Sequence, residues 1–297
     1  MTSEPSFTLP NFEVLELIGR GGMASVWKAR QLSLDRLVAV KILSSTFSEE
    51  KEDVERFRME AKTAARLRHP NIVQVYDANF RDGLCFFVME LVAGYTMGDL
   101  VRRKGNISEE DALTIAESVA VALDYAWNSF EMVHNDIKPD NIMVDEDGSL
   151  KVTDLGLSCS LALLKAENSS SDEILGTPAY MSPEQVRGDT DLDCRSDIYE
   201  LGATLYHLVS GHMLFEKKEP DAIVECHVNA MQAPDPREFV PHLSDSFVMM
   251  IEKMLAKDRR HRHGTWQELI DDIILIRNGG SPAAVSVPKH RSSVKCW

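Results

Sequence analysis

The chain has 297 residues, of which 44% are hydrophobic and 27% are charged, a composition that is ordinary for a soluble globular protein. This length accommodates either two domains of roughly 150 residues or one larger domain built from two lobes. The formal net charge of −15 argues against a nucleic-acid-binding protein, which needs a basic surface to meet the phosphate backbone. A phosphate-bearing ligand is still possible, because a few placed cations and a metal ion can override the global field locally.

Targeting patterns and cysteine usage favour a cytoplasmic protein. The sequence has no run of about 18 consecutive apolar residues, and residues 1–10 lack the basic and apolar regions of a secretory signal peptide. The five cysteines include no C-x-x-C pair and indicate reduced thiols rather than a disulfide framework. We therefore expect no membrane contact to be encoded in this chain.

The first third of the sequence has the pattern of a small sheet with one helix. Five segments that alternate or run apolar predict strands: 12–18, 25–30, 37–43, 72–77 and 84–91. Between the third and fourth of these, the charged segment 49–67 contains no glycine or proline and predicts a helix.

The rest of the sequence is mostly helical. Ser108 is a suitable N-cap for a helix that runs to about residue 127, with three acidic residues in its first turn. Residues 196–209 predict a strongly apolar helix that Gly211 ends. Two further helices are predicted at 247–255 and 266–276.

These patterns predict an α+β protein. We expect an N-terminal tail at 1–11 and one domain at 12–277, divided into a smaller strand-rich lobe at 12–90 and a larger helical lobe at 91–277. Residues 278–297 have the glycine, proline and serine content of a flexible tail or linker.

A glycine-rich segment, residues 19–26, lies between the first two predicted strands and reads Gly-Arg-Gly-Gly-Met-Ala-Ser-Val. Glycines let the backbone turn sharply and bring N–H groups close to phosphate oxygens. On this segment alone, a phosphate cover and an ordinary hairpin turn are equally good interpretations. The lack of a G-x-x-x-x-G-K-[ST] run argues against a P-loop, and the strand–loop–strand setting argues against a Rossmann turn.

Lys41 ends the apolar run Val-Ala-Val-Lys on the third predicted strand. Such a lysine is usually a surface residue whose stem covers apolar neighbours. Its place one strand after the glycine-rich segment favours instead a cation that anchors phosphates. Glu60, on the predicted helix, is the candidate partner that would hold it there. Apolar residues beside this glutamate mark an inward helix face: Ala61, Ala64, Ala65 and Leu67.

Residues 134–141 read His-Asn-Asp-Ile-Lys-Pro-Asp-Asn and form a polar stretch between two apolar pairs. Asp136 can accept the hydrogen bond of a substrate hydroxyl and orient it. Lys138 can neutralise charge on a transferring phosphoryl group. Asn141 offers an oxygen ligand suited to magnesium. The alternative is a turn whose Asp and Asn side chains satisfy local backbone groups.

Asp154-Leu155-Gly156 follows, and the Asp154 carboxylate would be a second oxygen ligand for magnesium. By itself the tripeptide is too common to be informative. The order of glycine loop, V-A-V-K, helical Glu, H-x-D-x-K-P-x-N and D-L-G, however, resembles the eukaryotic-like serine/threonine protein kinase family over roughly residues 12–276. The glycine loop is similar to that of bacterial members. The resemblance implies a two-lobed kinase fold, with a small, mainly antiparallel β lobe and a larger, mainly α lobe. It also implies that the chain transfers the γ-phosphoryl group of ATP, with Mg²⁺, to Ser or Thr hydroxyls of protein substrates.

By position, the resemblance implies the residues that hold the nucleotide. Met89 would be the gatekeeper behind the adenine, and backbone groups of Glu90 and Val92 would meet the adenine edge. Side chains would enclose the ring from Ile18, Val26, Ala39 and Met143. The phosphates would be covered or anchored by Gly19, Arg20, Gly21, Gly22, Met23, Ala24, Ser25, Lys41 and Asp154.

Further segments fit the same resemblance. Ser-Pro-Glu at 182–184 is similar to the motif that closes the family's activation segment, and Asp197 matches the aspartate that braces the catalytic loop. Arg262 matches the arginine that pairs with Glu184. Its basic neighbourhood, residues 257–262, has the alternative interpretation of a nucleic-acid patch, which the acidic chain disfavours.

Three positions depart from the family pattern. Ala24 replaces the third glycine of the loop, from which we expect altered ATP affinity rather than lost activity. Leu155 replaces a phenylalanine and keeps its apolar packing role. Asn135 replaces the arginine that normally receives the phosphate of a phosphorylated activation loop. Because asparagine has no charge, we predict that activity depends little on phosphorylation of that loop, although residues 169–171 are serines.

Two other functions fit parts of the pattern. A pseudokinase that acts as a nucleotide-binding scaffold would explain Ala24 and Asn135, but every residue proposed for the chemistry is present. A small-molecule kinase would share the fold but usually lacks the Ser-Pro-Glu segment and its Arg262 partner. The sequence leaves open the physiological substrate, the activating signal and whether the protein forms a homodimer.

Overall fold

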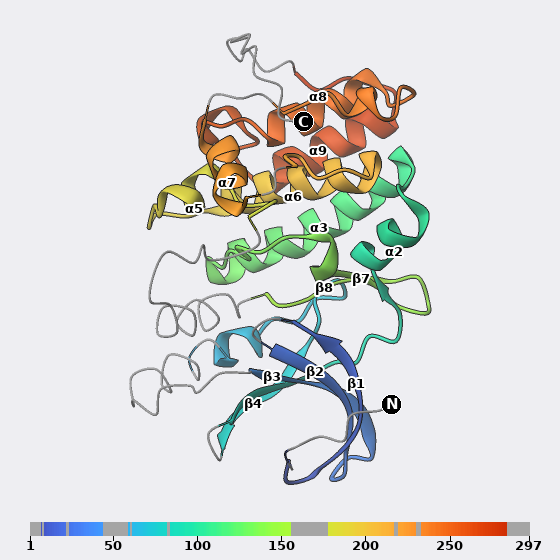
Figure 1. Ribbon diagram of the computed structural model, residues 1–297, viewed down its shortest axis with the longest axis vertical. Helices are drawn as coiled ribbons and strands as arrows, with labels where there is room; N and C mark the ends of the chain where they lie inside the picture. Colours follow the sequence, from blue (N-terminus) through green and yellow to red (C-terminus); the bar gives the residue numbers. More distant parts are fainter. Residues whose placement is uncertain are drawn as a thin grey trace. The chain divides into compact units, whose positions relative to one another are not determined.

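The computed structural model describes residues 7, 9–21, 24–43, 59, 61–81, 84–155, 178–216, 219–229 and 233–283, and the chain divides into two compact units (Figure 1). Unit 1 comprises Met1–Ala93 with Asp154–Glu173, and unit 2 comprises Gly94–Thr153 with Ile174–Trp297. The lobe boundary that the sequence suggested, after residue 90, stays a prediction, and the division in the structure follows Ala93.

Unit 1 contains one five-stranded antiparallel sheet in the order β1-β2-β3-β5-β4. Its strands are β1 (Phe12–Arg20), β2 (Ala24–Gln31), β3 (Arg36–Leu43), β4 (Val75–Arg81) and β5 (Leu84–Met89). The sequence predicted all five, but it placed β4 too early, at 72–77. Ile72 and Val73 are apolar because they are buried in the core, and the strand begins only after them.

The central strand β3 is buried on both faces. Val38, Val40 and Ile42 belong to one apolar cluster, and Ala39 and Leu43 belong to a second cluster on the other side of the sheet. This two-sided burial explains why the strand is a continuous apolar run rather than an alternating one.

Unit 2 is built mainly of helices, with one small sheet. The helices are α2 (Met97–Lys104), α3 (Glu109–Phe130), α5 (Pro183–Arg187), α6 (Cys194–Ser210), α7 (Pro220–Val228), α8 (Asp245–Met254) and α9 (Trp266–Arg277). The small sheet has the order β6-β7-β8, from β6 (Tyr95–Thr96), β7 (Ile142–Val144) and β8 (Leu150–Val152). The 3-10 turn η1 (Pro139–Asn141) precedes β7.

Helix α6 forms the centre of unit 2 and packs against α3 and α8, while α9 packs along α3 (Figure 1). Almost every residue of α6 is buried, so the helix is apolar all round rather than on one face. It ends at Gly211, whose φ of 77° lies in the left-handed region, as the sequence predicted. The Ser108 cap of α3 is also confirmed, since its hydroxyl accepts a hydrogen bond from the Asp111 N–H.

No helix within the described ranges is long and apolar enough to cross a bilayer. The start of the predicted C-terminal tail contacts α8, because the Ser246 hydroxyl donates to the Gly280 carbonyl at 3.0 Å and lies 2.8 Å from the Ser281 hydroxyl. Residues 284–297 lie outside the described part of the chain.

Candidate active site

The glycine-rich segment forms the hairpin between β1 and β2. The two strands pair up to Arg20 and Ser25, and the Gly21 N–H donates to the Ala24 carbonyl at 2.8 Å. The Ala24 side chain packs against one of the apolar clusters of unit 1. Residues 22 and 23 lie outside the described ranges.

Neither Gly19 nor Gly21 is required by the packing of the hairpin itself. A Cβ atom built at either position would meet its nearest neighbour at 3.6 Å, an ordinary van der Waals distance, and neither residue has a positive φ. Without Cβ atoms, these two residues instead leave the backbone open to close approach by another molecule.

Lys41 lies in the buried part of β3, with only 6% of its surface exposed. It pairs with Val26 on β2 and with Phe87 on β5. A buried ammonium group is stable only with a counter-charge, and the Lys41 Nζ lies 2.7 Å from Asp154 Oδ1. Within unit 1, the structure therefore brings the predicted cation to the predicted magnesium ligand.

Glu60 lies outside the described residues, so its pairing with Lys41 stays a prediction. The helical residues that follow it do show the expected inward face. Ala61, Ala64 and Leu67 are buried, and Ala65 is half-buried.

Four of the residues proposed for the adenine ring contribute to the same cluster in unit 1. Ala39 and Met89 are direct partners across β3 and β5 and are buried, while Val26 and Val92 pack against them and their neighbours. Ile18 is largely exposed.

Glu90 follows β5, and its backbone N–H donates to the Gln74 carbonyl at 2.9 Å. Any contact of Glu90 with an adenine edge would therefore use its carbonyl oxygen. Met143, the remaining residue proposed for the ring, is half-buried on β7 of unit 2.

In unit 2, the loop before β7 brings Asp136, Lys138 and Asn141 together. The Lys138 Nζ lies 2.7 Å from Asp136 Oδ2, and the Asn141 Nδ2 donates to the same oxygen at 3.0 Å and to the Asp136 carbonyl at 2.8 Å. These bonds use the amide nitrogen of Asn141, so Oδ1 is the atom that this residue can offer to a cation. The carboxylate of Asp136 is one-quarter exposed and thus accessible to a substrate.

The backbone of this loop is fixed from below by α6. The two carboxylate oxygens of Asp197 accept hydrogen bonds from the N–H groups of His134, at 2.7 Å, and Asn135, at 2.8 Å. The His134 Nε2 lies 2.8 Å from the Thr153 carbonyl, so it carries the proton, and Nδ1 accepts from the Asp136 N–H at 3.3 Å. The bracing role expected for Asp197 is therefore confirmed.

Sequence reasoning missed three polar residues that contact this loop: Gln185, Glu200 and Thr204. The sequence does contain a signal for the last two. With Asp197 they form a polar spacing of three and four residues within an otherwise apolar helix, which places all three on one face.

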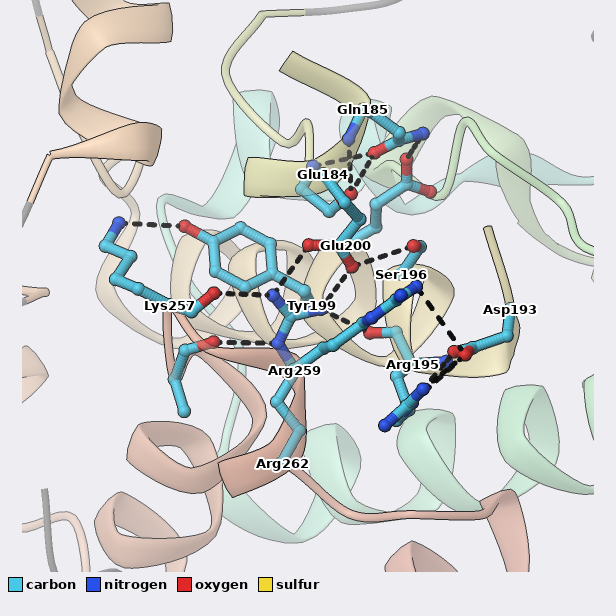
Figure 2. Close-up of polar contacts among 12 residues, drawn as sticks. Glu184, Gln185, Asp193, Arg195, Ser196, Tyr199, Glu200, Lys257, Arg259 and Arg262 are labelled. Carbon is cyan, nitrogen blue, oxygen red and sulfur yellow. Dashed lines mark hydrogen bonds and ion pairs between the residues drawn. The ribbon is translucent and has the colours of Figure 1, made fainter. Parts of the chain in front are cut away.

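Glu184 and Arg262 form a buried ion pair between α5 and the segment before α9 (Figure 2). The guanidinium nitrogens contact the two carboxylate oxygens at 2.6 and 2.9 Å, and the Ser196 hydroxyl donates to Glu184 at 2.7 Å. Burial alone would raise the pKa of the Glu184 carboxyl, but the hydrogen bonds and charge of Arg262 bring it below its usual value. The pairing predicted from sequence is confirmed.

A family described as the protein kinase domain matches residues 12–273 of this sequence. The chain belongs to the protein kinase family. This match spans both units and every motif described above.

The curated relatives of this kinase domain are bacterial serine/threonine kinases. It is 37% identical to the probable serine/threonine-protein kinase PknB of Bifidobacterium longum, over 93% of this chain and 41% of that protein. It is also 37% identical to serine/threonine-protein kinase PrkC of Bacillus subtilis, over 88% of this chain and 40% of that protein. The chain is thus a bacterial-type serine/threonine protein kinase domain that spans about two-fifths of the length of these relatives.

Solved structures share the fold of this kinase domain. A double-mutant PknI kinase domain of Mycobacterium tuberculosis matches with a TM-score of 0.73 and 26% identity, over 92% of this chain and 98% of that one. Rad53 in complex with AMP-PNP matches with a TM-score of 0.72 and 25% identity, over 88% of this chain and 64% of that one.

Proposed function

We propose that this kinase domain transfers the γ-phosphoryl group of ATP to serine or threonine hydroxyls of protein substrates. The observation that carries the proposal is the arrangement around Asp136, where one accessible carboxylate is held by Lys138 and Asn141. In line with this, Rad53, whose fold the chain shares, was crystallised with AMP-PNP.

Unit 1 supplies the residues that bind and anchor the nucleotide. The open backbone at Gly19 and Gly21 favours hydrogen bonds from N–H groups to phosphate oxygens. The buried ammonium of Lys41 provides a fixed positive charge for the triphosphate. Ala39 and Met89 provide an apolar surface for the adenine ring.

Unit 2 supplies the residues that act on the acceptor hydroxyl. Asp136 accepts its hydrogen bond and aims the oxygen at the phosphorus, because the transition state needs the attacking and leaving oxygens in line. Lys138, already within 2.7 Å of this carboxylate, neutralises charge on the transferring group.

Magnesium would be held by Asp154 and Asn141, whose carboxylate and amide oxygens are the donor type that this ion prefers. Bound there, the ion would neutralise negative charge on the phosphates. Asn141 is prepared for this role, because its two bonds to Asp136 fix the orientation of the amide.

Regulation follows from Asn135, which offers no positive charge to a phosphorylated activation loop. We propose that the enzyme depends little on that modification. Homodimer formation stays a prediction that concerns the protein rather than this chemistry.

The test compares wild type with Asp136→Asn in a radiolabelled Mg-ATP assay on protein substrates. The variant keeps the size of the side chain but loses the full charge, so we expect it to fold and bind ATP with essentially no transfer. Wild-type turnover with a good substrate should be on the order of 1–100 per second. Asp147→Asn, the same change at an exposed turn residue, serves as the control and should retain wild-type rates.

Equal labelling by wild type and Asp136→Asn would reject the role of Asp136. An inactive wild type that binds ATP would favour a pseudokinase. Transfer to small alcohols but not to casein or basic protein would favour a small-molecule kinase.

A further inference from the structure

Helix α6 presents three polar side chains to the catalytic loop, and only the first was expected. Besides Asp197, the Glu200 Oε2 accepts a hydrogen bond from the Ile137 N–H at 2.7 Å, and the Thr204 hydroxyl donates to the Ile137 carbonyl at 3.0 Å. Glu200 is 1% exposed. A carboxylate in such a position needs a reason, because apolar residues fill most of this helix.

The second oxygen of Glu200 contacts Gln185, as Figure 2 shows. The Gln185 Nε2 donates to Glu200 Oε1 at 2.6 Å and to the Asn135 carbonyl at 3.1 Å. The Gln185 Oε1 accepts from both the N–H and the hydroxyl of Ser182, each at 2.7 Å, within the capping box that begins α5. Both ends of the Gln185 amide are therefore fixed.

These contacts grip Asp136 from both sides along the chain. The Asn135 carbonyl belongs to the peptide plane that precedes Asp136, and the Ile137 N–H belongs to the plane that follows it. Gln185 holds the first plane and Glu200 holds the second, and the two side chains are bonded to each other. The orientation of Asp136 depends on these two planes, because its Cα atom joins them.

A carboxylate is the side chain that this geometry requires at position 200. It must accept two hydrogen bonds from two different N–H donors, which both oxygens of a glutamate can do and an amide cannot. The arrangement is costly, since burial and the nearby charge of Asp197 both raise the pKa of the Glu200 carboxyl. An apolar residue would pack there without this penalty.

We propose that Glu200 and Gln185 are positioning residues that hold Asp136 in its working orientation and tie the catalytic loop to α5. This inference rests on the proposed function of Asp136. The pair acts on the loop backbone on either side of that residue and involves no charged group at Asn135, whose φ of 62° it helps to fix. It provides a permanent contact at the place where a phosphate-binding arginine would otherwise act.

The test measures kcat and KM for ATP in wild type, Glu200→Gln, Glu200→Ala and Gln185→Ala. The glutamine variant keeps the acceptor for Ile137 but turns a donor toward Gln185, so kcat should fall by about tenfold. The alanine variants should lose more, toward about a hundredfold, because misplacing a catalytic group by about 1 Å has effects of that size. KM for ATP should stay within about twofold, since Lys41 and the glycine loop are unchanged. Glu225→Gln, the same change on the exposed face of α7, is the matched control and should behave as wild type.

A second readout does not depend on activity. In wild type the Ile137 N–H is buried and bonded, so it should exchange slowly with deuterium. In Glu200→Ala, the peptide containing residues 134–137 should exchange faster, while peptides from α3 and α9 keep their protection. Combining Glu200→Ala with Gln185→Ala should lower kcat by less than the product of the two single effects, because both remove the same contact.

Unchanged kcat in Glu200→Ala and Gln185→Ala would overturn the inference, as would a loss of kcat no larger than the unfolded fraction measured by circular dichroism. Unchanged exchange at residues 134–137 would overturn it as well. Failure of the proposed function gives a different result: wild type itself would transfer no phosphate, and exchange at Ile137 would then decide whether the pair holds the loop.

Discussion

The Glu184–Arg262 pair makes the strongest local demand on charge in unit 2. Both side chains are fully buried, and Arg262 also donates to the backbone carbonyls of Ala256 and Arg195, each at 2.7 Å. A buried pair of this kind contributes little by forming, but breaking it is expensive because one charge is left uncompensated.

We therefore expect Glu184→Gln to lower the free energy of unfolding at neutral pH by about 3–5 kcal/mol. The pKa of the Glu184 carboxyl is lower in the folded protein than the usual 4.5, so its contribution is present above about that pH. It is lost as the pH falls through the folded value. Urea unfolding of wild type and variant between pH 7 and pH 3 measures the difference.

The gap between the two proteins should narrow as the pH falls below the usual glutamate value, because both then lack the charge. Glu225→Gln, on the exposed surface of α7, controls for the substitution and should follow wild type throughout. A gap that stays constant or widens in acid would show that charge pairing is not what stabilises this site.

At the scale of single residues, the sequence identified the chemistry better than the contacts. Asp136, Lys138 and Asn141 could be assigned because short spacings in one loop bring them together whatever the rest of the fold does. The ion pair of Lys41 with Asp154 is different, because only the folded unit brings a strand residue beside a carboxylate far along the chain. Glu200 was missed because a lone acid in a helix resembles a solvated surface charge.

Helix α6 and its end at Gly211 show how an element is limited by a neighbouring backbone. A Cβ atom at Gly211 would lie 2.6 Å from the carbonyl oxygen of Gly105, at the end of α2. This carbonyl is backbone, so rotation of a side chain cannot relieve the contact. Gly188, which ends α5 with a similar φ of 71°, has no atom of the described residues within 4 Å of such a Cβ.

The two glycines give a matched pair of substitutions. Gly188→Ala should lower the free energy of unfolding by about 1–2 kcal/mol, the penalty for an L-residue in the left-handed region. Gly211→Ala should lower it by about 2–4 kcal/mol, because steric overlap adds to the same backbone strain. Urea midpoints at constant m value measure both changes. Equal losses at the two sites would mean that the contact with Gly105 has no energetic weight.

At the scale of elements, helices with long apolar patterns and clear ends were predictable, and short ones were not. Ser108 and Gly211 marked the ends of α3 and α6 because their side chain or φ satisfies helix termini locally. Helices α2, α5 and α7 have few turns each and too short a pattern to read, so packing against neighbours decides them.

At the scale of the whole molecule, two separate demands are met by two units of different construction. Unit 1 uses a sheet to bury the one cation of β3's interior, Lys41, beside Asp154. Unit 2 uses the apolar helix α6 as a rigid support for the catalytic loop. The motif order along the chain predicted this division of labour, because each motif lies on the type of element that its chemistry requires. The bracing within unit 2 could not be predicted, since it depends on which faces of α5 and α6 meet the loop.

This support also determines how the intact enzyme should respond to phosphorylation of its activation loop. With no positive charge at Asn135, and with the loop backbone held by Asp197, Glu200 and Gln185, phosphate has no contact to add at this point. We expect replacement of Ser169, Ser170 and Ser171 by alanine to leave the rate of peptide phosphorylation within about threefold of wild type.

Phosphatase treatment of the wild-type enzyme before the assay is the matched control and should give the same rate as the triple variant. The serines lie outside the described residues, so the argument depends on the loop that would receive the phosphate rather than on the serines themselves. A loss of about a hundredfold in either experiment would mean that another cation takes the place of the missing arginine, and that the permanent bracing of Asp136 is insufficient for activity.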